Sequence, residues 1–238
     1  MDFRSADHLP RQRADGVPPP PEQLPRQRVG VTPQMHGRYP EYDVLANAGH
    51  WDEVTRELVL SRVDDVPAVR FFNTAEERTL RRFCDLVMAQ DTDPRIPVLE
   101  MVDAKLASGQ LDGYRHHDLP EDPETWRLVA AGLDEAAGDA FADLDPNDAA
   151  RIVGLFAKGD LEGGVWETIP CAKAWSVVMR GVASAFYSHP WAWNEIGYGG
   201  PAYPRGYMRL GIGQREPHQA REVGEEDPVE EVARAGLG

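Results

Sequence analysis

The chain has 238 residues, 42% of them hydrophobic, and carries a formal net charge of −15 with a sequence pI near 4.8. This length allows one domain, alone or with tails. An acidic surface repels nucleic acid and anionic lipid, which argues against binding to either. The charge is explained by simple solubility or, alternatively, by a partner with a basic face.

The two ends of the chain lack the hydrophobic periodicity of folded elements. Residues 1–40 are rich in proline and arginine and are predicted to form a disordered or partner-bound arm. Residues 211–238 carry an acidic run and are predicted to be a flexible tail. Between them, residues 41–210 are predicted to form one all-α domain, either a helical bundle or an orthogonal array.

The sequence lacks the features of exported and membrane-spanning chains. The N-terminal stretch has no apolar core of a secretory signal. No apolar run approaches the ~20 residues that a membrane-spanning helix needs. We therefore expect no direct membrane insertion and a cytoplasmic location, and export together with a signal-bearing partner is left open.

The first half of the helical region contains three expected helices. A short one is predicted over residues 52–63 and has to end before Pro67. The next is predicted to begin at Asn73-Thr74, where Thr74 and Glu77 have the spacing of a capping box. The third is predicted to be opened by Asp93-Pro94 and to be stopped by Gly109.

The second half contains three more expected helices and no alternation typical of a strand. Two of them are predicted to begin at the Asp-Pro pairs 122–123 and 145–146. The apolar stripe of the first runs from Trp126 to Leu144, and Gly159 ends the second. The last long helix has large apolar side chains at successive turns, namely Cys171, Trp175, Val178, Met179, Val182 and Phe186.

The motifs of common cofactor sites and hydrolase sites are missing from the sequence. There is no glycine-rich phosphate loop, no GxSxG and no HExxH, so we expect no flavin or nicotinamide site within this chain. Cys84 and Cys171 lie in apolar helical contexts without a haem-attachment pattern. Buried free thiols are expected, with a single disulfide as the alternative.

Three histidines are the remaining candidates for chemistry. His116 and His117 are adjacent, and side chains at neighbouring positions rarely converge on one metal ion. A polar loop is the default interpretation, and a metal site is the alternative. His189 lies at the end of the last long helix and is expected to cap its final carbonyls, with a catalytic role as the alternative.

Residues 186–210 combine many aromatic side chains with a backbone interrupted by glycine and proline. Such a run cannot form a long helix or a central strand. Large rings on an irregular backbone need a surface to lie against, either the core of this chain or a partner. We predict a partner interface, and an intramolecular cap is the alternative. The predicted interface residues are Trp191, Trp193, Ile196, Tyr198, Pro201, Tyr203, Pro204, Arg205 and Tyr207.

This stretch resembles the C-terminal signature of the gluconate 2-dehydrogenase subunit 3 family, whose members end in a variant of W..IGY.GPAYPRGY. The matching residues are Trp193, Ile196, Gly197, Tyr198, Gly200, Pro201, Tyr203, Pro204, Arg205, Gly206 and Tyr207. The helical part from about residue 73 to 188 is similar to the family in a looser way. Many relatives begin with a twin-arginine signal, which this chain lacks.

The resemblance implies a non-catalytic accessory subunit. Such a subunit assembles with a large FAD-dependent dehydrogenase of the glucose–methanol–choline type and stabilises or matures it, in some members together with a cytochrome c subunit. The large subunit holds the FAD and oxidises gluconate or a related sugar, whereas the small one holds no cofactor or metal. The alternatives are a freestanding helical binding module or metal-dependent enzyme that uses His116, His117 or His189, and a homodimer built on the aromatic segment.

Overall fold

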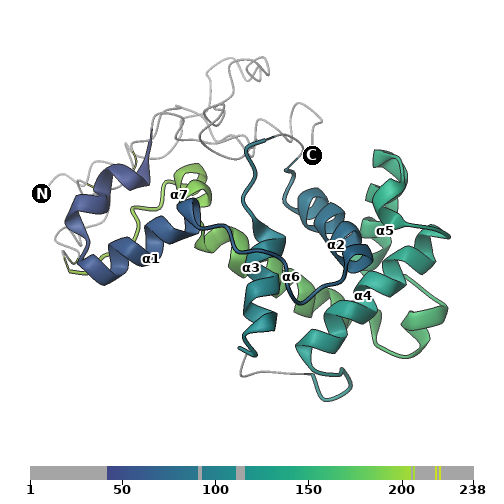
Figure 1. Ribbon diagram of the computed structural model, residues 1–238. Helices are drawn as coiled ribbons and strands as arrows, with labels where there is room; N and C mark the ends of the chain where they lie inside the picture. Colours follow the sequence, from purple (N-terminus) through teal and green to yellow (C-terminus); the bar gives the residue numbers. More distant parts are fainter. Residues whose placement is uncertain are drawn as a thin grey trace, which may run out of the picture. The chain divides into compact units, whose positions relative to one another are not determined.

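A computed structural model describes residues 42–90, 93–110, 116–204, 206, 218 and 220. All regular elements in these residues are helices, which confirms the predicted all-α class (Figure 1). The predicted arm over residues 1–40 lies outside the described residues, as does the predicted tail apart from His218 and Ala220. None of the helices in the described ranges is both long enough and apolar enough to cross a membrane.

The chain divides into two compact units. Unit 1 takes its described residues from three separate stretches, which are residues 42–65, residues 93–96 and the residues from 187 onward. Unit 2 contains residues 66–90 and 97–186. Each unit has its own buried side chains, so each is described by itself below.

Unit 2 is built from most of the long helices. They are α2 (Thr74–Val87), α3 (Val98–Ala107), α4 (Asp122–Ala137), α5 (Pro146–Lys158) and the greater part of α6 (Cys171–Ser188), with the short 3-10 helices η3 (Phe141–Asp143) and η4 (Gly164–Glu167). Helix α2 packs against α3, α4 and α5, and α4 also packs against η3 and η4.

Four aromatic side chains join the helices of unit 2 in its core. The ring of Phe156 lies 5.2 Å from that of Trp175, 5.0 Å from Trp166 and 6.0 Å from Phe83, measured between centroids. The Phe156 and Trp175 rings meet edge to face, the arrangement that aromatic quadrupoles favour. The cluster connects α2, α5, η4 and α6, which explains why the predicted stripe of α6 is largely buried.

The helix ends follow local capping signals, with three corrections to the predicted boundaries. Helix α3 begins only at Val98, after Pro97, so the prediction that Asp93-Pro94 opens it is wrong. Helix α5 begins after Asp145, whose carboxylate accepts from the next two backbone N–H groups, and ends at Gly159 as predicted. Helix α2 is capped one residue earlier than expected, because Asn73 and Glu76 form the capping box. Helix α4 ends at Ala137, because Gly138 adopts a left-handed conformation with φ of 72°. The predicted continuation to Leu144 is therefore wrong.

Both cysteines are free and buried in unit 2, as predicted. Burial raises the pKa of the Cys84 thiol far above its ordinary value, with a smaller contribution from the charge of Asp85. Desolvation also raises the pKa of Cys171. Because the thiolate is the reactive form, neither cysteine is suited to nucleophilic chemistry.

Unit 1 contains the 3-10 helix η2 (Val44–His50), α1 (Glu53–Asp64) and α7 (Pro190–Ile196). The short helix predicted over residues 52–63 is found as α1. Helix α7 packs against both η2 and α1, so the two ends of the described chain share one core. The aromatic segment is thus not wholly irregular, since one short helix lies within it.

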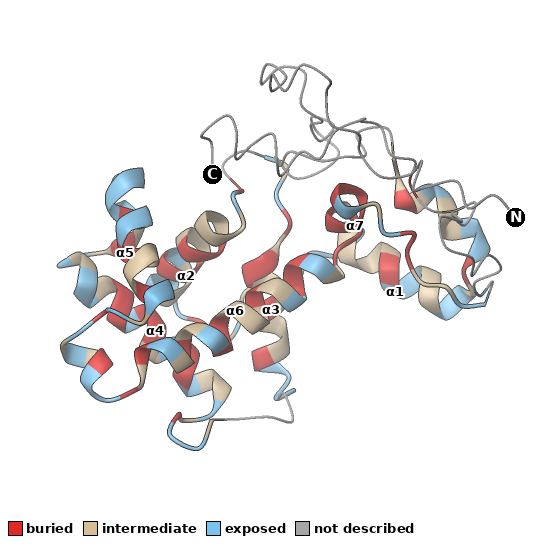
Figure 2. Cartoon of the chain, turned by 180° about the vertical axis from the view of Figure 1, so that it is seen from behind, coloured by how far each residue is buried: buried red, intermediate tan, exposed pale blue. Residues whose placement is uncertain are grey.

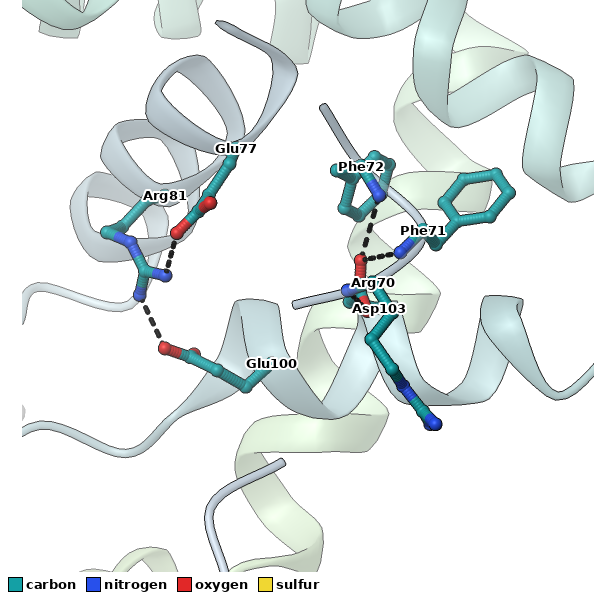
Figure 3. A network of polar contacts seen from close by, with 7 residues as sticks. All are labelled: Arg70, Phe71, Phe72, Glu77, Arg81, Glu100 and Asp103. Atoms are coloured by element: carbon teal, nitrogen blue, oxygen red, sulfur yellow. Dashed lines mark hydrogen bonds and ion pairs between the residues drawn. The ribbon is translucent and has the colours of Figure 1, made fainter. Parts of the chain in front are cut away.

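The carboxylate of Asp103 in α3 is fully buried and holds the irregular segment that precedes α2 (Figure 3). One of its oxygens accepts from the backbone N–H of Arg70 at 2.7 Å. The other accepts from the N–H groups of Phe71 and Phe72 at 2.8 and 2.9 Å. Three donors that burial would otherwise leave unpaired are satisfied by one side chain.

We expect Asp103→Asn to destabilise unit 2 by about 3 kcal/mol, because an amide NH₂ would then face the backbone donors that the carboxylate accepts from. The free energy of unfolding in urea measures the effect. The matched control is Asp139→Asn, which changes an exposed aspartate of the same unit and should cost less than about 0.5 kcal/mol. Equal stability of the two variants would refute this role for Asp103.

Candidate partner interface

Helix α7 is framed by residues that fix where it begins and ends. The imidazole Nδ1 of His189 accepts from the backbone N–H of Trp191 at 3.2 Å, and Pro190 occupies the first helical position. Gly197 ends the helix in a left-handed conformation. His189 therefore caps the start of α7, and the expectation that it caps the final carbonyls of the preceding helix is wrong.

Trp193 is the buried anchor of this helix. Its side chain is 6% exposed and belongs to a cluster with Val44, Trp51 and Val59. The indole Nε1 donates to the backbone carbonyl of Tyr187 at 2.6 Å, so its one polar atom is satisfied. Helix α7 is red over nearly its whole length in Figure 2, which marks it as the most enclosed helix of unit 1.

Two further contacts hold α7 and the residues after it against η2. The side-chain carbonyl of Asn194 accepts from the backbone N–H of Val44 at 2.7 Å, in a buried position. Gly200 has a φ of 75°, and a Cβ there would lie 2.7 Å from the Trp51 ring and 3.1 Å from Val44. Only glycine satisfies both the backbone conformation and the close packing at this position.

Arg62 of α1 adds a cationic contact to the same core. Its guanidinium donates to the carbonyl of Ser188 at 2.6 Å and lies 6.0 Å from the centroid of the Trp193 ring. Desolvation lowers the pKa of Arg62, although a guanidinium stays charged under all ordinary conditions. The contact ties the end of α1 to the start of the C-terminal segment.

The same segment presents apolar side chains outward. Ile196 is 50% exposed, Tyr198 41% and Tyr203 68%, and Pro204 is also exposed. Tyr198 packs its ring edge to face against Trp193 at 5.4 Å, so an exposed side chain rests directly on the buried anchor. Exposed apolar groups on a backbone held by a packed core are suited to binding a protein surface.

The structure separates the nine predicted interface residues into different environments. Trp193 is buried inside unit 1, and Trp191 and Pro201 are half-buried. Ile196, Tyr198, Tyr203 and Pro204 are exposed, whereas Arg205 and Tyr207 lie outside the described residues. Trp193 thus has the surroundings expected of an intramolecular cap, and the exposed four are accessible to a partner.

The three histidines of the alternative hypothesis have separate surroundings. His189 is buried in unit 1 and faces a helix start. In unit 2, His117 is almost fully exposed with Asp118 4.0 Å away, and the neighbouring His116 is half-buried. Among the described residues, no three metal-ligating side chains come together.

Sequence reasoning missed the contribution of residues 42–51 to this site. Tyr42 donates its hydroxyl proton to the carbonyl of His218 at 2.9 Å, and Val44 and Trp51 form the surface on which Trp193 lies. The available signal was the presence of a tyrosine and a tryptophan beside a short apolar stretch. It did not reveal that their partner is more than 140 residues away in the sequence.

Comparison with known proteins gives one match. A family model described as gluconate 2-dehydrogenase subunit 3 matches residues 74–200, just over half of the chain. The match includes α7 and Gly200 but not η2, α1 or Tyr203. No curated protein and no solved structure matches the chain.

We expect Trp193→Ala to lower the free energy of unfolding of unit 1 by about 3 to 5 kcal/mol, because it leaves a cavity among buried side chains. Urea unfolding followed by circular dichroism measures this. Tyr203→Ala removes a large but exposed ring and should change the value by less than about 0.5 kcal/mol. Similar stabilities for the two variants would show that Trp193 is not an anchor.

The buried His189 should make unit 1 less stable in acid. Desolvation lowers its pKa from 6.5 to about 4, partly opposed by a hydrogen bond to the backbone of Arg62. As the pH falls below 6.5, the unfolded chain gains a proton that the folded chain does not, so stability is lost until the pH reaches the folded pKa. This one group should cost about 2 kcal/mol between pH 7 and pH 5.

His189→Asn keeps a capping side chain without this titration, so the variant should lose less stability than the parent over the same pH range. Urea unfolding at pH 7 and pH 5 gives the comparison. His117→Asn, which replaces an exposed imidazole by the same side chain, is the matched control. An unchanged pH dependence in His189→Asn would contradict the prediction.

Proposed function

Because the chain belongs to the gluconate 2-dehydrogenase subunit 3 family, we propose that it is a non-catalytic accessory subunit of a dehydrogenase complex. In this proposal it assembles with a large FAD-dependent dehydrogenase of the glucose–methanol–choline type, which oxidises gluconate or a related sugar. The FAD is assigned to the large subunit, and a cytochrome c subunit is an additional candidate partner.

The observation that carries the proposal is the pairing of buried and exposed aromatic side chains in one short segment. Trp193 and Asn194 fix the backbone of α7 from the inside. Ile196, Tyr198 and Tyr203 then project from a backbone that is already held in place. A preorganised surface loses little conformational entropy on binding, and tyrosine is among the residues enriched in interface cores.

The remaining chemistry of the described residues supports a binding role over a catalytic one. His189 is committed to capping α7, and the thiols of Cys84 and Cys171 are buried with raised pKa values. The acidic groups with lowered pKa values are also explained by local structure. Asp118 lies beside Lys173. The pKa of Asp145 is lowered first by a side-chain hydrogen bond with Asp148 and then by the backbone N–H groups of Asp148 and Asn147 that it caps in α5.

A stabilising role follows from linkage. A subunit that binds only the folded large chain adds its binding free energy to the stability of that fold, and the gain grows with its concentration. No proton, hydride or electron needs to pass through this chain for such an effect. The proposed role therefore requires an exposed docking surface and a rigid support, which are the two properties of the segment around α7.

The test is to tag the chain in its native host, purify it gently and record the visible spectrum with the identities of the co-purifying chains. We expect a large chain in stoichiometric amount and the absorption of bound flavin. A colourless chain without a co-purifying partner would overturn the proposal.

The same purification tests the surface. The double variant Ile196→Ser with Tyr203→Ser should bind the large chain at least about 30-fold less tightly, as expected for the loss of about 2 kcal/mol at an interface hot spot. Val66→Ser is the matched control, because Val66 is an equally exposed apolar residue of unit 2. Undiminished recovery of the large chain with the double variant would place the interface elsewhere.

A further inference from the structure

Helix α1 has an outward face that nothing in the described residues covers. Val54 and Leu58 are 73% and 55% exposed, although both are large apolar side chains. Glu53, Glu57 and Asp64 are exposed on the same helix, and none of the three has an ion pair with a described residue. In Figure 2, pale blue interrupts α1, in contrast to the almost entirely red α7.

Helical geometry divides this face into two parallel edges. Glu53, Glu57 and Asp64 are spaced by four and seven residues and so line one edge. Val54 and Leu58 are spaced by four residues and line the neighbouring edge, about 100° further round the helix. A ligand that fits this face therefore needs positive charges beside apolar side chains.

One segment of this chain has that composition. Residues 24–40 contain three arginines, Arg26, Arg28 and Arg38, and no acidic residue. The rest of the chain is strongly acidic, since the net charge is −15. The same segment contains the apolar residues Leu24, Val29, Val31 and Met35.

We propose that the outward face of α1 is a docking surface for residues 24–40 of the same chain. In an extended backbone, successive side chains point to opposite sides. Arg26 and Arg28 then share one side and meet the acidic edge, while Val29 and Val31 share the other side and meet Val54 and Leu58. The contact is separate from the surface around α7 and does not depend on the proposed function.

The chain is long enough for this contact to form within one molecule. Residues 28–42 can span about 46 Å when fully extended. From Tyr42, the path through η2 to Glu57 in the acidic edge of α1 is at most about 36 Å, from about 3.6 Å per connecting residue, 2.0 Å per residue in η2 and 1.5 Å in α1. Because the segment is tethered to the helix that it binds, its effective concentration is high and a modest intrinsic affinity suffices.

Paramagnetic relaxation in the full-length protein tests the proposal. A nitroxide attached at Gly30→Cys should reduce the NMR intensities of the α1 backbone amides at least twofold relative to the reduced label. The native thiols of Cys84 and Cys171 are buried, so the label is directed to position 30. The double variant Glu57→Lys with Asp64→Lys should restore most of the intensity, and so should 1 M salt, because both weaken the charge pairing.

The matched control is Asp139→Lys with Glu162→Lys, which makes the same change in net charge at exposed positions of unit 2 and should leave the broadening intact. The proposal would be overturned if the α1 amides of the parent showed no broadening. It would also be overturned if the broadening were equally strong in the parent and in the double variant Glu57→Lys with Asp64→Lys. A mixture of nitroxide-labelled chains without isotopes and isotope-labelled chains without nitroxide shows whether the occupant of the α1 face comes from the same molecule or from another one. Broadening between separate molecules would assign the face to a second copy and would also overturn the proposal.

Discussion

The burial of the Trp193 indole is the interaction on which unit 1 depends. Its ring lies on side chains contributed by η2 and α1, and its nitrogen is paired with the end of α6 through the carbonyl of Tyr187. Other contacts between the start of the described chain and its C-terminal segment include the hydrogen bonds of Asn194 and Arg62 and the close approach of Gly200 to Trp51. A large aromatic group with one polar atom is well suited to this position, because it buries extensive apolar surface and leaves no unpaired donor.

The aromatic segment therefore has two tasks that belong to different residues. Side chains that point inward fix the backbone, and those that point outward are exposed on its surface. Tyr198 connects the two, because its exposed ring rests on the buried indole. The indole of Trp193 packs inside unit 1, as the intramolecular cap requires, and the exposed rings of Tyr198 and Tyr203 belong to the same short segment.

Features of this fold could be predicted from the sequence when the residues that determine them are close together in the chain. The limits of α5 were predictable because Asp145 and Gly159 act on their own helix end. The end of α4 was missed because Gly138 interrupts an apolar stripe that continues beyond it, with Phe141 buried in a separate turn. The sequence alone could not show whether Trp193 is buried or exposed. Its burial depends on contacts with Val44 and Trp51, which are remote in sequence.

The division of unit 1 between remote stretches of sequence has a consequence for synthesis. Residues 42–65 leave the ribosome early, but their core closes only when residues 187–200 have also emerged. Unit 2 is contiguous apart from one short excursion and can fold while translation continues. At typical elongation rates of about 5 to 20 residues per second, η2 and α1 wait on the order of ten seconds for α7. During that interval Val44 and Trp51 are exposed to chaperones, and the packed segment around α7 forms only after residues 187–200 have been made.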